Sequence, residues 1–457
     1  MQDMTEGGIG SKIFNFTLPL LLGNIFQQLY NMVDSIVVGQ FIGKEAIAAV
    51  GVSFPIMFLL IALTMGATMG TTVLVAQFFG AKNFQALKRT ISTAYIFLFV
   101  TSIVVMVLGF VLTTSILKLL GTPADVFNNA KTYMLIIFAG LPFLFGYNSL
   151  SAILRGLGDS KTPLYLLIIS TIINIFLDLL FVITFKLGVG GAAFATIIAQ
   201  GISFVLGIYF LNKRNELFSL KNRFVFDWDI FKKSLSIGLP SGVQQVMVSV
   251  GMMLLMSIVN RFGTEVLAAY TAATRIESFA TMPAMNFSMA ISTFVGQNLG
   301  AKKHERIKKG VRSTLLMTLV ISFVISFFIL TFPEFLISLF NRDSRVISVG
   351  KEYLRIVGFF YFTFAIMFVF NGVLRGAGDT IVPMLATVFS QFVLRVPISA
   401  YLSGIWGTKG IWWGIPIAWW SGMIFSFVYY KIGNWKNKVI RLEEVKKEEV
   451  LEELEKF

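Results

Sequence analysis

Three carboxylates stand inside long apolar stretches of the chain, where they are the residues best placed to do chemistry. They are Asp34, Asp178 and Glu277. A charged side chain at the centre of a bilayer costs roughly 2.5 to 3.5 kcal/mol on insertion scales, so each one needs a functional or structural reason.

Polar residues accompany two of the carboxylates at helical spacing. Residues three, four and seven apart share one face of a helix, and three such stripes occur in the first half of the chain. The stripes are Gln27, Asn31 and Asp34, bordered by Tyr30; Thr171, Asn174 and Asp178; and Thr196, Gln200 and Ser203. Turned toward each other, they would enclose a small hydrated cavity.

Such a cavity could serve either of two cations. Carboxylate, amide and hydroxyl oxygens are hard ligands that suit Na⁺. A buried aspartate could instead take a proton from one side of a membrane and release it to the other. A third interpretation is a polar network that only joins helices. The residues alone leave these interpretations open.

Further charges lie in the second half. Arg275 and Glu277 are two residues apart, so they should point to nearly opposite faces of one helix and find partners elsewhere. Arg395 shares a stripe with Gln391 and Ser399. Glu277 could help to hold a cationic substrate, but for Arg275, Glu277 and Arg395 structural and substrate-binding roles are equally open.

The sequence gives little support for an enzyme activity. The chain has no cysteine and one histidine, His304, and it lacks GxxxxGK[ST] and HExxH sequences, which argues against zinc sites, Ser/His catalysis and nucleotide hydrolysis. Two GxGD sequences end at Asp159 and Asp379, but both precede a helix-starting proline and read as a turn and a cap. We expect no enzyme activity and no cofactor beyond a coupling ion.

The composition indicates which elements must position these residues. Of 457 residues, 56% are hydrophobic and only 14% are charged, about half the charged fraction of soluble proteins. At about 20 residues a span, the chain accommodates about twelve transmembrane helices. We place them near residues 14–39, 46–78, 91–116, 130–153, 163–185, 190–211, 234–260, 266–298, 313–339, 346–374, 383–403 and 409–430.

The distribution of charge predicts an orientation. With twelve spans, the termini and the even-numbered connections share one side, which holds 26 Lys and Arg against 10 on the other side. The positive-inside rule then places both termini in the cytoplasm, in a multi-pass protein of the inner membrane. The net charge of +14 thus reflects topology, and we expect no nucleic-acid partner.

The chain repeats itself at an offset of 220 residues. ILRGLGDSKTP at 153–163 returns as VLRGAGDTIVP at 373–383, and VAQFFGAKN at 75–83 returns as VGQNLGAKK at 295–303. Two six-helix bundles related by an axis along the membrane normal are typical of transporters. The predicted parts are an N-terminal lobe (1–211), a linker (212–232), a C-terminal lobe (233–430) and a charged tail (431–457).

These paired motifs, with the polar first span QQLYNMVDSIVVGQ, resemble the MATE family of multidrug and toxic compound extrusion antiporters, in particular its DinF-type bacterial branch. The resemblance implies export of small organic cations and lipophilic drugs in exchange for H⁺ or Na⁺. It assigns the cation-responsive site to Asp34, Asn174, Asp178 and Thr196. A bend at Pro19, matched by Pro240 in the second half, is one mechanism that relatives suggest.

The second half departs from another branch of the family. NorM-type members carry acidic residues in the seventh and tenth spans, whereas the segments SGVQQVMVSVGMM and YFTFAIMFVFNGVL of those spans contain none here, which argues against a NorM-like ion site. A related flippase of lipid-linked precursors is the alternative function, although it would need a more cationic cavity than Arg275 and Arg395 provide. We expect a monomer that contacts membrane lipid.

Overall fold

The computed structural model describes residues 2–214 and 225–437, and every regular element in these ranges is helical. Residues 215–224 of the predicted linker and all of the tail beyond residue 437 lie outside the described residues. Helices of the first half are α1 (Ile9–Phe41), α2 (Lys44–Gly80), α3 (Phe84–Leu119), α4 (Ala124–Ala139), α5 (Leu141–Gly156), α6 (Lys161–Asp178), the π-helix η1 (Leu179–Thr184) and α7 (Gly188–Arg214).

The second half has the same plan with more interruptions. Its helices are α8 (Trp228–Asn260), α9 (Thr264–Gly300), α10 (His304–Thr331), α11 (Pro333–Ser338), α12 (Ser344–Gly358), α13 (Tyr361–Gly376), α14 (Ile381–Val388), the π-helix η3 (Phe389–Arg395), α15 (Val396–Trp406), α16 (Thr408–Ile432) and the short 3₁₀ turn η4 (Trp435–Asn437).

The number of spans agrees with the sequence. Within the described ranges, nine helical segments are long and apolar enough to cross a membrane, and two further pairs, α4 with α5 and α12 with α13, form spans bent by 49°. The remaining long helix is α9, whose 37 residues include Arg275 and Glu277. Twelve spans in an all-α protein are the predicted fold class.

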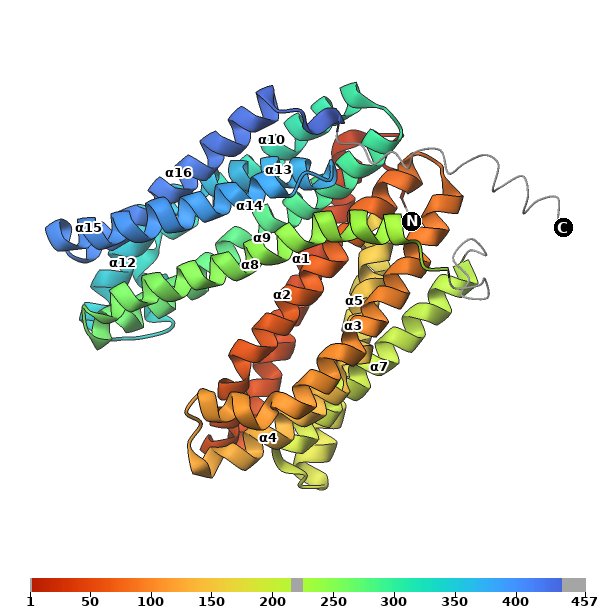
Figure 1. Ribbon diagram of the computed structural model, residues 1–457. Coiled ribbons are helices and arrows are strands. Elements are labelled where there is room, and N and C mark those ends of the chain that lie inside the picture. Colours follow the sequence, from red (N-terminus) through yellow and green to blue (C-terminus); the bar gives the residue numbers. More distant parts are fainter. Residues whose placement is uncertain (1, 215–224, 438–457) are drawn as a thin grey trace.

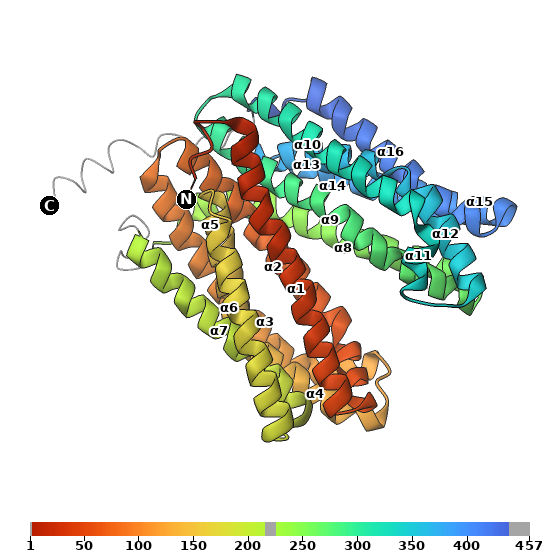
Figure 2. The ribbon, with the colours of Figure 1, turned by 180° about the vertical axis from the view of Figure 1, so that it is seen from behind.

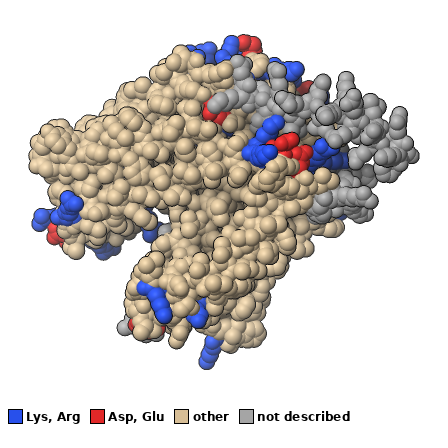
Figure 3. Space-filling model, in the orientation of Figure 1, with Lys and Arg blue, Asp and Glu red and all other residues tan. Residues whose placement is uncertain are grey.

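The spans form two lobes that meet at one end and diverge toward the other (Figures 1 and 2). Helices α1 to α7 make the N-terminal lobe, and α8 to α16 make the C-terminal lobe. The chain's N-terminus lies at the end where the lobes meet (Figure 1). The space-filling view shows an open notch between the two arms, with charged side chains near the junction and at the arm tips (Figure 3). We call this notch the interlobe cleft.

Small residues allow the lobes to approach closely at the junction. A Cβ atom on Gly66 of α2 would lie 2.9 Å from the Cα atom of Gly242 of α8, and one on Gly70 would lie 2.0 Å from the carbonyl oxygen of Ser234. No side chain fits in such a space, so Gly66 and Gly70 allow α2 and α8 to pack closely.

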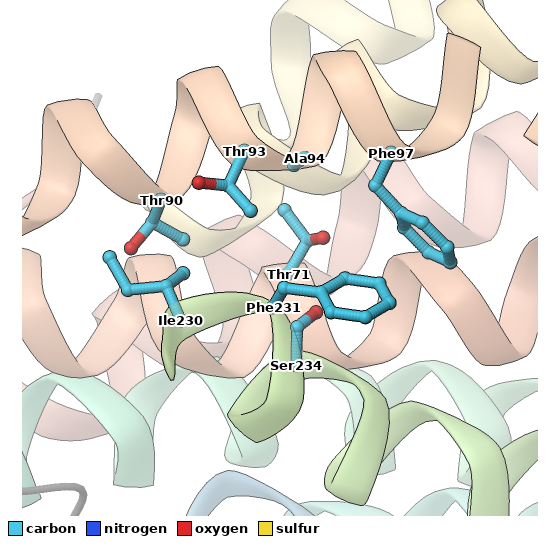
Figure 4. A pocket seen from close by; sticks show the side chains of 8 residues that line it. All are labelled: Thr71, Thr90, Thr93, Ala94, Phe97, Ile230, Phe231 and Ser234. Atoms are coloured by element: carbon cyan, nitrogen blue, oxygen red, sulfur yellow. The ribbon is translucent and has the colours of Figure 1, made fainter. Parts of the chain in front are cut away.

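A shallow pocket lies beside this crossing, between α2, α3 and the first turns of α8 (Figure 4). Its polar lining consists of threonine and serine hydroxyls, and Phe97 and Phe231 close one side. The start of α8 is tied to α3 nearby, because the backbone N–H of Asp227 donates to Thr93 Oγ1 at 3.0 Å. Neither Asp34 nor Asp178, the carboxylates predicted to bind an ion, lines this pocket.

The internal repeat is visible in backbone geometry. Gly158 and Gly378 adopt φ values of +77° and +88°, and Lys82 and Lys302 adopt +56° and +58°, each pair 220 residues apart. Asp159 caps α6 as predicted, accepting from the N–H groups of Lys161 at 3.1 Å and Thr162 at 3.0 Å. Its repeat partner Asp379 accepts instead from the Tyr429 hydroxyl at 2.6 Å.

Two repeat-related glutamines join the lobes. Gln77 of α2 donates to the carbonyl oxygen of Gly376 at 3.0 Å, and Gln297 of α9 donates to that of Gly156 at 3.0 Å. Both side chains are almost fully buried. We call this reciprocal pair the glutamine seam. The close approach of the two helices at the glutamine seam requires that α2 and α9 end in glycine, because a Cβ on Gly80 would lie 1.9 Å from the Gln297 carbonyl oxygen.

The N-terminal segment, residues 2–7, crosses the same end of the molecule. The Met4 N–H donates to Gln297 Oε1 at 2.9 Å. Arg306 at the start of α10 donates to the carbonyl oxygens of Met4, Glu6 and Gly7. The segment thus fastens the glutamine seam to the C-terminal lobe, and the junction of the lobes is closed.

The two prolines predicted as kinks lie within long helices. Pro19 is inside α1 and Pro240 is inside α8, so neither begins its helix. Each removes one backbone N–H from the helical ladder. Their role as hinges stays a prediction.

Candidate functional site

Residues predicted to bind an ion come together in the N-terminal lobe, where α6 changes its winding. The α-helix ends at Asp178 and continues as the π-helix η1. π-segments often mark functional positions in membrane and soluble helices. Asn174 and Asp178 are fully buried, one turn apart, on the face of α6 directed at α1 and α7.

Asn174 and Tyr30 connect the three helices. With its amide oriented so that both atoms have partners, Asn174 donates to Asp178 Oδ2 at 3.0 Å and accepts from the Thr196 N–H of α7 at 3.3 Å. The Tyr30 hydroxyl of α1 donates to Thr196 Oγ1 at 3.1 Å. Four predicted residues, from three spans, therefore share one network.

The carboxylates leave part of their bonding capacity unused. Asp34 Oδ1 and Asp178 Oδ1 are both buried, and neither has a hydrogen-bond partner within the described parts of the chain. The two side chains are near enough for their negative charges to repel each other. Two ionised carboxylates in this position would be costly, so the arrangement favours a proton or a bound cation between them.

Tyr133 of α4 completes the site and was not predicted. Its side chain is buried within electrostatic range of both Asp34 and Asp178. The sequence offers one signal for it, a second tyrosine at the repeat offset of 220 residues, Tyr353. The structure shows that Tyr353 contacts Glu277 in the other lobe.

Other residues predicted to line the cavity lie around this network. Gln27 and Asn31 are exposed on α1, with their side chains 3.4 Å apart. Thr171 bonds the Leu167 carbonyl of its own helix at 2.9 Å. Gln200 is half-buried one turn after Thr196. The helical stripes thus locate the site, but only some of their members join it.

The donor set fits H⁺ or Na⁺. Among the described residues, no group of three or more His, Cys, Asp or Glu side chains could hold a metal ion, whereas a pair of carboxylates with amide and hydroxyl oxygens suits a hard monovalent cation. These residues would supply the oxygens to such an ion.

The C-terminal lobe has a polar centre of a different kind. Glu277 of α9 accepts a hydrogen bond from the Tyr353 hydroxyl of α12. The Tyr270 and Trp412 rings stack beside it, with centroids 5.8 Å apart. Arg395 in η3 is 95% buried, within electrostatic range of Glu277, and donates to Gln391 Oε1 at 3.1 Å. Glu277 and Arg395 are thus the charged residues of this polar centre.

Arg275 and Glu277 do not pair, as the spacing predicted. Glu277 points into the C-terminal lobe toward Tyr353, and Arg275 is exposed on the other side of α9. Arg395 shares its stripe with Gln391 as predicted, while Ser399 instead donates to the Ile411 carbonyl at 3.1 Å.

Twelve spans in two repeat-related lobes, a cleft between the lobes and buried charged side chains within each lobe are the architecture of a membrane transporter. The family model MatE matches the chain twice, over residues 19–180 and 240–401. The two matches follow the internal repeat. The chain belongs to the MATE family, which consists of transporters and not of enzymes.

Individual relatives cover nearly the whole chain. The chain is 35% identical to the probable multidrug resistance protein YpnP of Bacillus subtilis, over 95% of this chain and 97% of the relative, and 32% identical to YoeA of the same organism, over 96% and 97%. A solved structure described as the outward-facing conformation of a MATE family transporter matches with a TM-score of 0.87 at 24% identity, over 94% of this chain and 96% of that chain.

Proposed function

We propose that the protein is a secondary antiporter that exports amphipathic, often cationic, organic compounds and takes up H⁺ or Na⁺ in exchange. The observation that carries this proposal is the pair of buried carboxylate oxygens on Asp34 and Asp178 that have no hydrogen-bond partner in the described structure. The relatives YpnP and YoeA, both named probable multidrug resistance proteins, support the type of substrate.

The site and the cleft would be coupled through α1. This helix carries Asp34 and Tyr30 into the ion site, and its Asn24 side chain donates to Asn286 of α9 in the opposite lobe at 3.1 Å. A cation at Asp34 removes the repulsion between the two aspartates and so changes how α1 packs against α6 and α7. The ion shifts the populations of the two conformations only by its difference in affinity for them.

The charge distribution supports the orientation. The closed junction carries the N-terminus, the glutamine seam and the basic residues Lys302, Lys303 and Arg306, which matches the cytoplasmic side of the positive-inside rule. The interlobe cleft then opens to the outside of the inner membrane. In this state an external cation would enter the N-terminal lobe as substrate leaves the cleft.

A transport measurement tests the proposal. Purified protein in liposomes is given a fluorescent organic cation under a pH gradient or a Na⁺ gradient, imposed separately, and Asp34→Asn is compared with wild type. We expect one gradient to drive dye movement in wild type and neither to do so in Asp34→Asn. Dye movement in wild type that ignores both gradients, or that persists unchanged in the variant, would contradict antiport through this site.

A further inference from the structure

Arg275 presents a positive charge to the interlobe cleft. The contact between Asn24 of α1 and Asn286 of α9 fixes which faces of these helices meet across the lobes. Arg275 lies eleven residues before Asn286, close to three full turns, and therefore shares that face, about 16 Å farther from the junction. There α1 and α9 have diverged with their lobes (Figure 2).

The residues around Arg275 form a surface of polar and aromatic side chains that suits contact with water. Thr271 and Ser278 on the same side of α9 are exposed, and Phe279, one turn nearer the junction, is 57% exposed. On α1 the cleft face continues from Asn24 through Gln28 to Asn31, all exposed. Amides and hydroxyls in mid-span are expected beside water and not beside lipid tails.

Within the described parts of the chain, no carboxylate pairs with Arg275. The described residues offer it no ion pair or hydrogen bond, and Glu277, only two residues away, faces the opposite side of the helix, where Tyr353 binds it. Arg395 is buried in the C-terminal lobe beside Gln391. Arg275 is thus the charge that α9 shows to a compound in the cleft, and its guanidinium is a planar donor that suits a carboxylate.

We propose that Arg275 binds the carboxylate of amphipathic aromatic substrates, so that the cleft accepts zwitterions and monoanions in addition to organic cations. Phe279 supplies an aromatic surface next to the guanidinium, and the α1 amides supply donors and acceptors on the opposite wall. This inference rests on the proposed function for its biological meaning. It concerns the binding step alone, which can be measured without a gradient.

Two dyes that differ by one group test the inference. Rhodamine 110 carries a free carboxylate, and rhodamine 123 is its methyl ester. Their binding to the purified, full-length protein in detergent is followed by fluorescence anisotropy, for wild type and for Arg275→Gln, Arg275→Lys and Arg261→Gln. The last variant removes an exposed positive charge from the end of α8, outside the cleft face of α9.

We expect Arg275→Gln to weaken rhodamine 110 binding about tenfold and to leave rhodamine 123 binding within about twofold of wild type or to improve it. Arg275→Lys should retain only part of the affinity, because it keeps the positive charge and loses the planar pair of donors, and Arg261→Gln should match wild type. Equal losses for both dyes, no loss for either, or a wild type that binds neither dye would each overturn the inference.

The two proposals fail separately. If the liposome assay shows no gradient-driven transport, but Arg275→Gln weakens the binding of rhodamine 110 and not that of rhodamine 123, the antiport proposal fails and the carboxylate site stands. If antiport is intact but Arg275→Gln changes the binding of both dyes equally, only the carboxylate site fails.

Discussion

Removing the glutamine seam should open the closed end of the protein. In wild type, Gln77 and Gln297 each donate one buried hydrogen bond to a carbonyl oxygen of the opposite lobe, at 3.0 Å. A buried hydrogen bond contributes about 1 kcal/mol net. The variant with both Gln77→Ala and Gln297→Ala therefore loses about 2 kcal/mol from the closed state, which raises the population open at this end about thirtyfold.

Thiol labelling can measure this change, because the chain contains no cysteine that would react in the background. Ala76 of α2 is fully buried, and a Cβ on Gly296 of the other lobe would lie 2.9 Å from the Cβ of Ala76. A single Ala76→Cys substitution thus reports on separation of the lobes. We expect a small maleimide to label it about thirtyfold faster in the double variant.

A control removes two amides that do not join the lobes. Gln28 and Gln85 are both exposed, and the pair Gln28→Ala and Gln85→Ala should leave the labelling rate of Ala76→Cys unchanged. If the seam variant reacts at the same rate as this control, the two hydrogen bonds do not hold the closed state and the reasoning is wrong.

Three further predictions concern stability and the N-terminal segment. Gly70→Ala should lower the melting temperature in detergent, because the added Cβ would lie 2.0 Å from the Ser234 carbonyl oxygen and overpacking costs about 1–3 kcal/mol. Gly51→Ala on the same helix adds a Cβ in open space and should leave the melting temperature unchanged. Equal melting temperatures of the two variants would contradict the packing argument. Tyr353→Phe should destabilise the protein by about 1–3 kcal/mol because it deprives Glu277 of its donor, in contrast to Tyr401→Phe at an exposed position. Arg306→Ala should release residues 2–7 and speed their removal by protease, and Arg312→Ala, exposed on the same helix, should leave the cleavage rate at the wild-type value.

Much of the fold could be predicted because a bilayer imposes long apolar spans and the duplication repeats local signals. Twelve spans and the turns at Gly158 and Gly378 follow from such patterns. The bends of 49° within two spans and the π-helices were not predicted. They depend on packing between helices, which a single helical period does not record.

The site was predicted in part for the same reason. Polar residues at helical spacing identified Asp34, Asn174 and Asp178, since such residues are rare in apolar spans. Tyr133 and Tyr353 were missed because tyrosine is common in membrane helices and its role depends on which carboxylate lies opposite. Helical spacing did separate Arg275 from Glu277, but only the three-dimensional structure shows that Glu277 binds Tyr353 while Arg275 is exposed.

The most direct test of the account counts the ions that substrate displaces. Purified protein in weakly buffered detergent solution receives saturating fluorescent organic cation, and the released H⁺ and Na⁺ are measured for wild type, Asp34→Asn, Asp178→Asn and Glu277→Gln. The account predicts release of one kind of ion from wild type and Glu277→Gln, and none from either aspartate variant. Release that is unchanged in both aspartate variants, or absent from wild type that binds the dye, would contradict coupling through the N-terminal lobe.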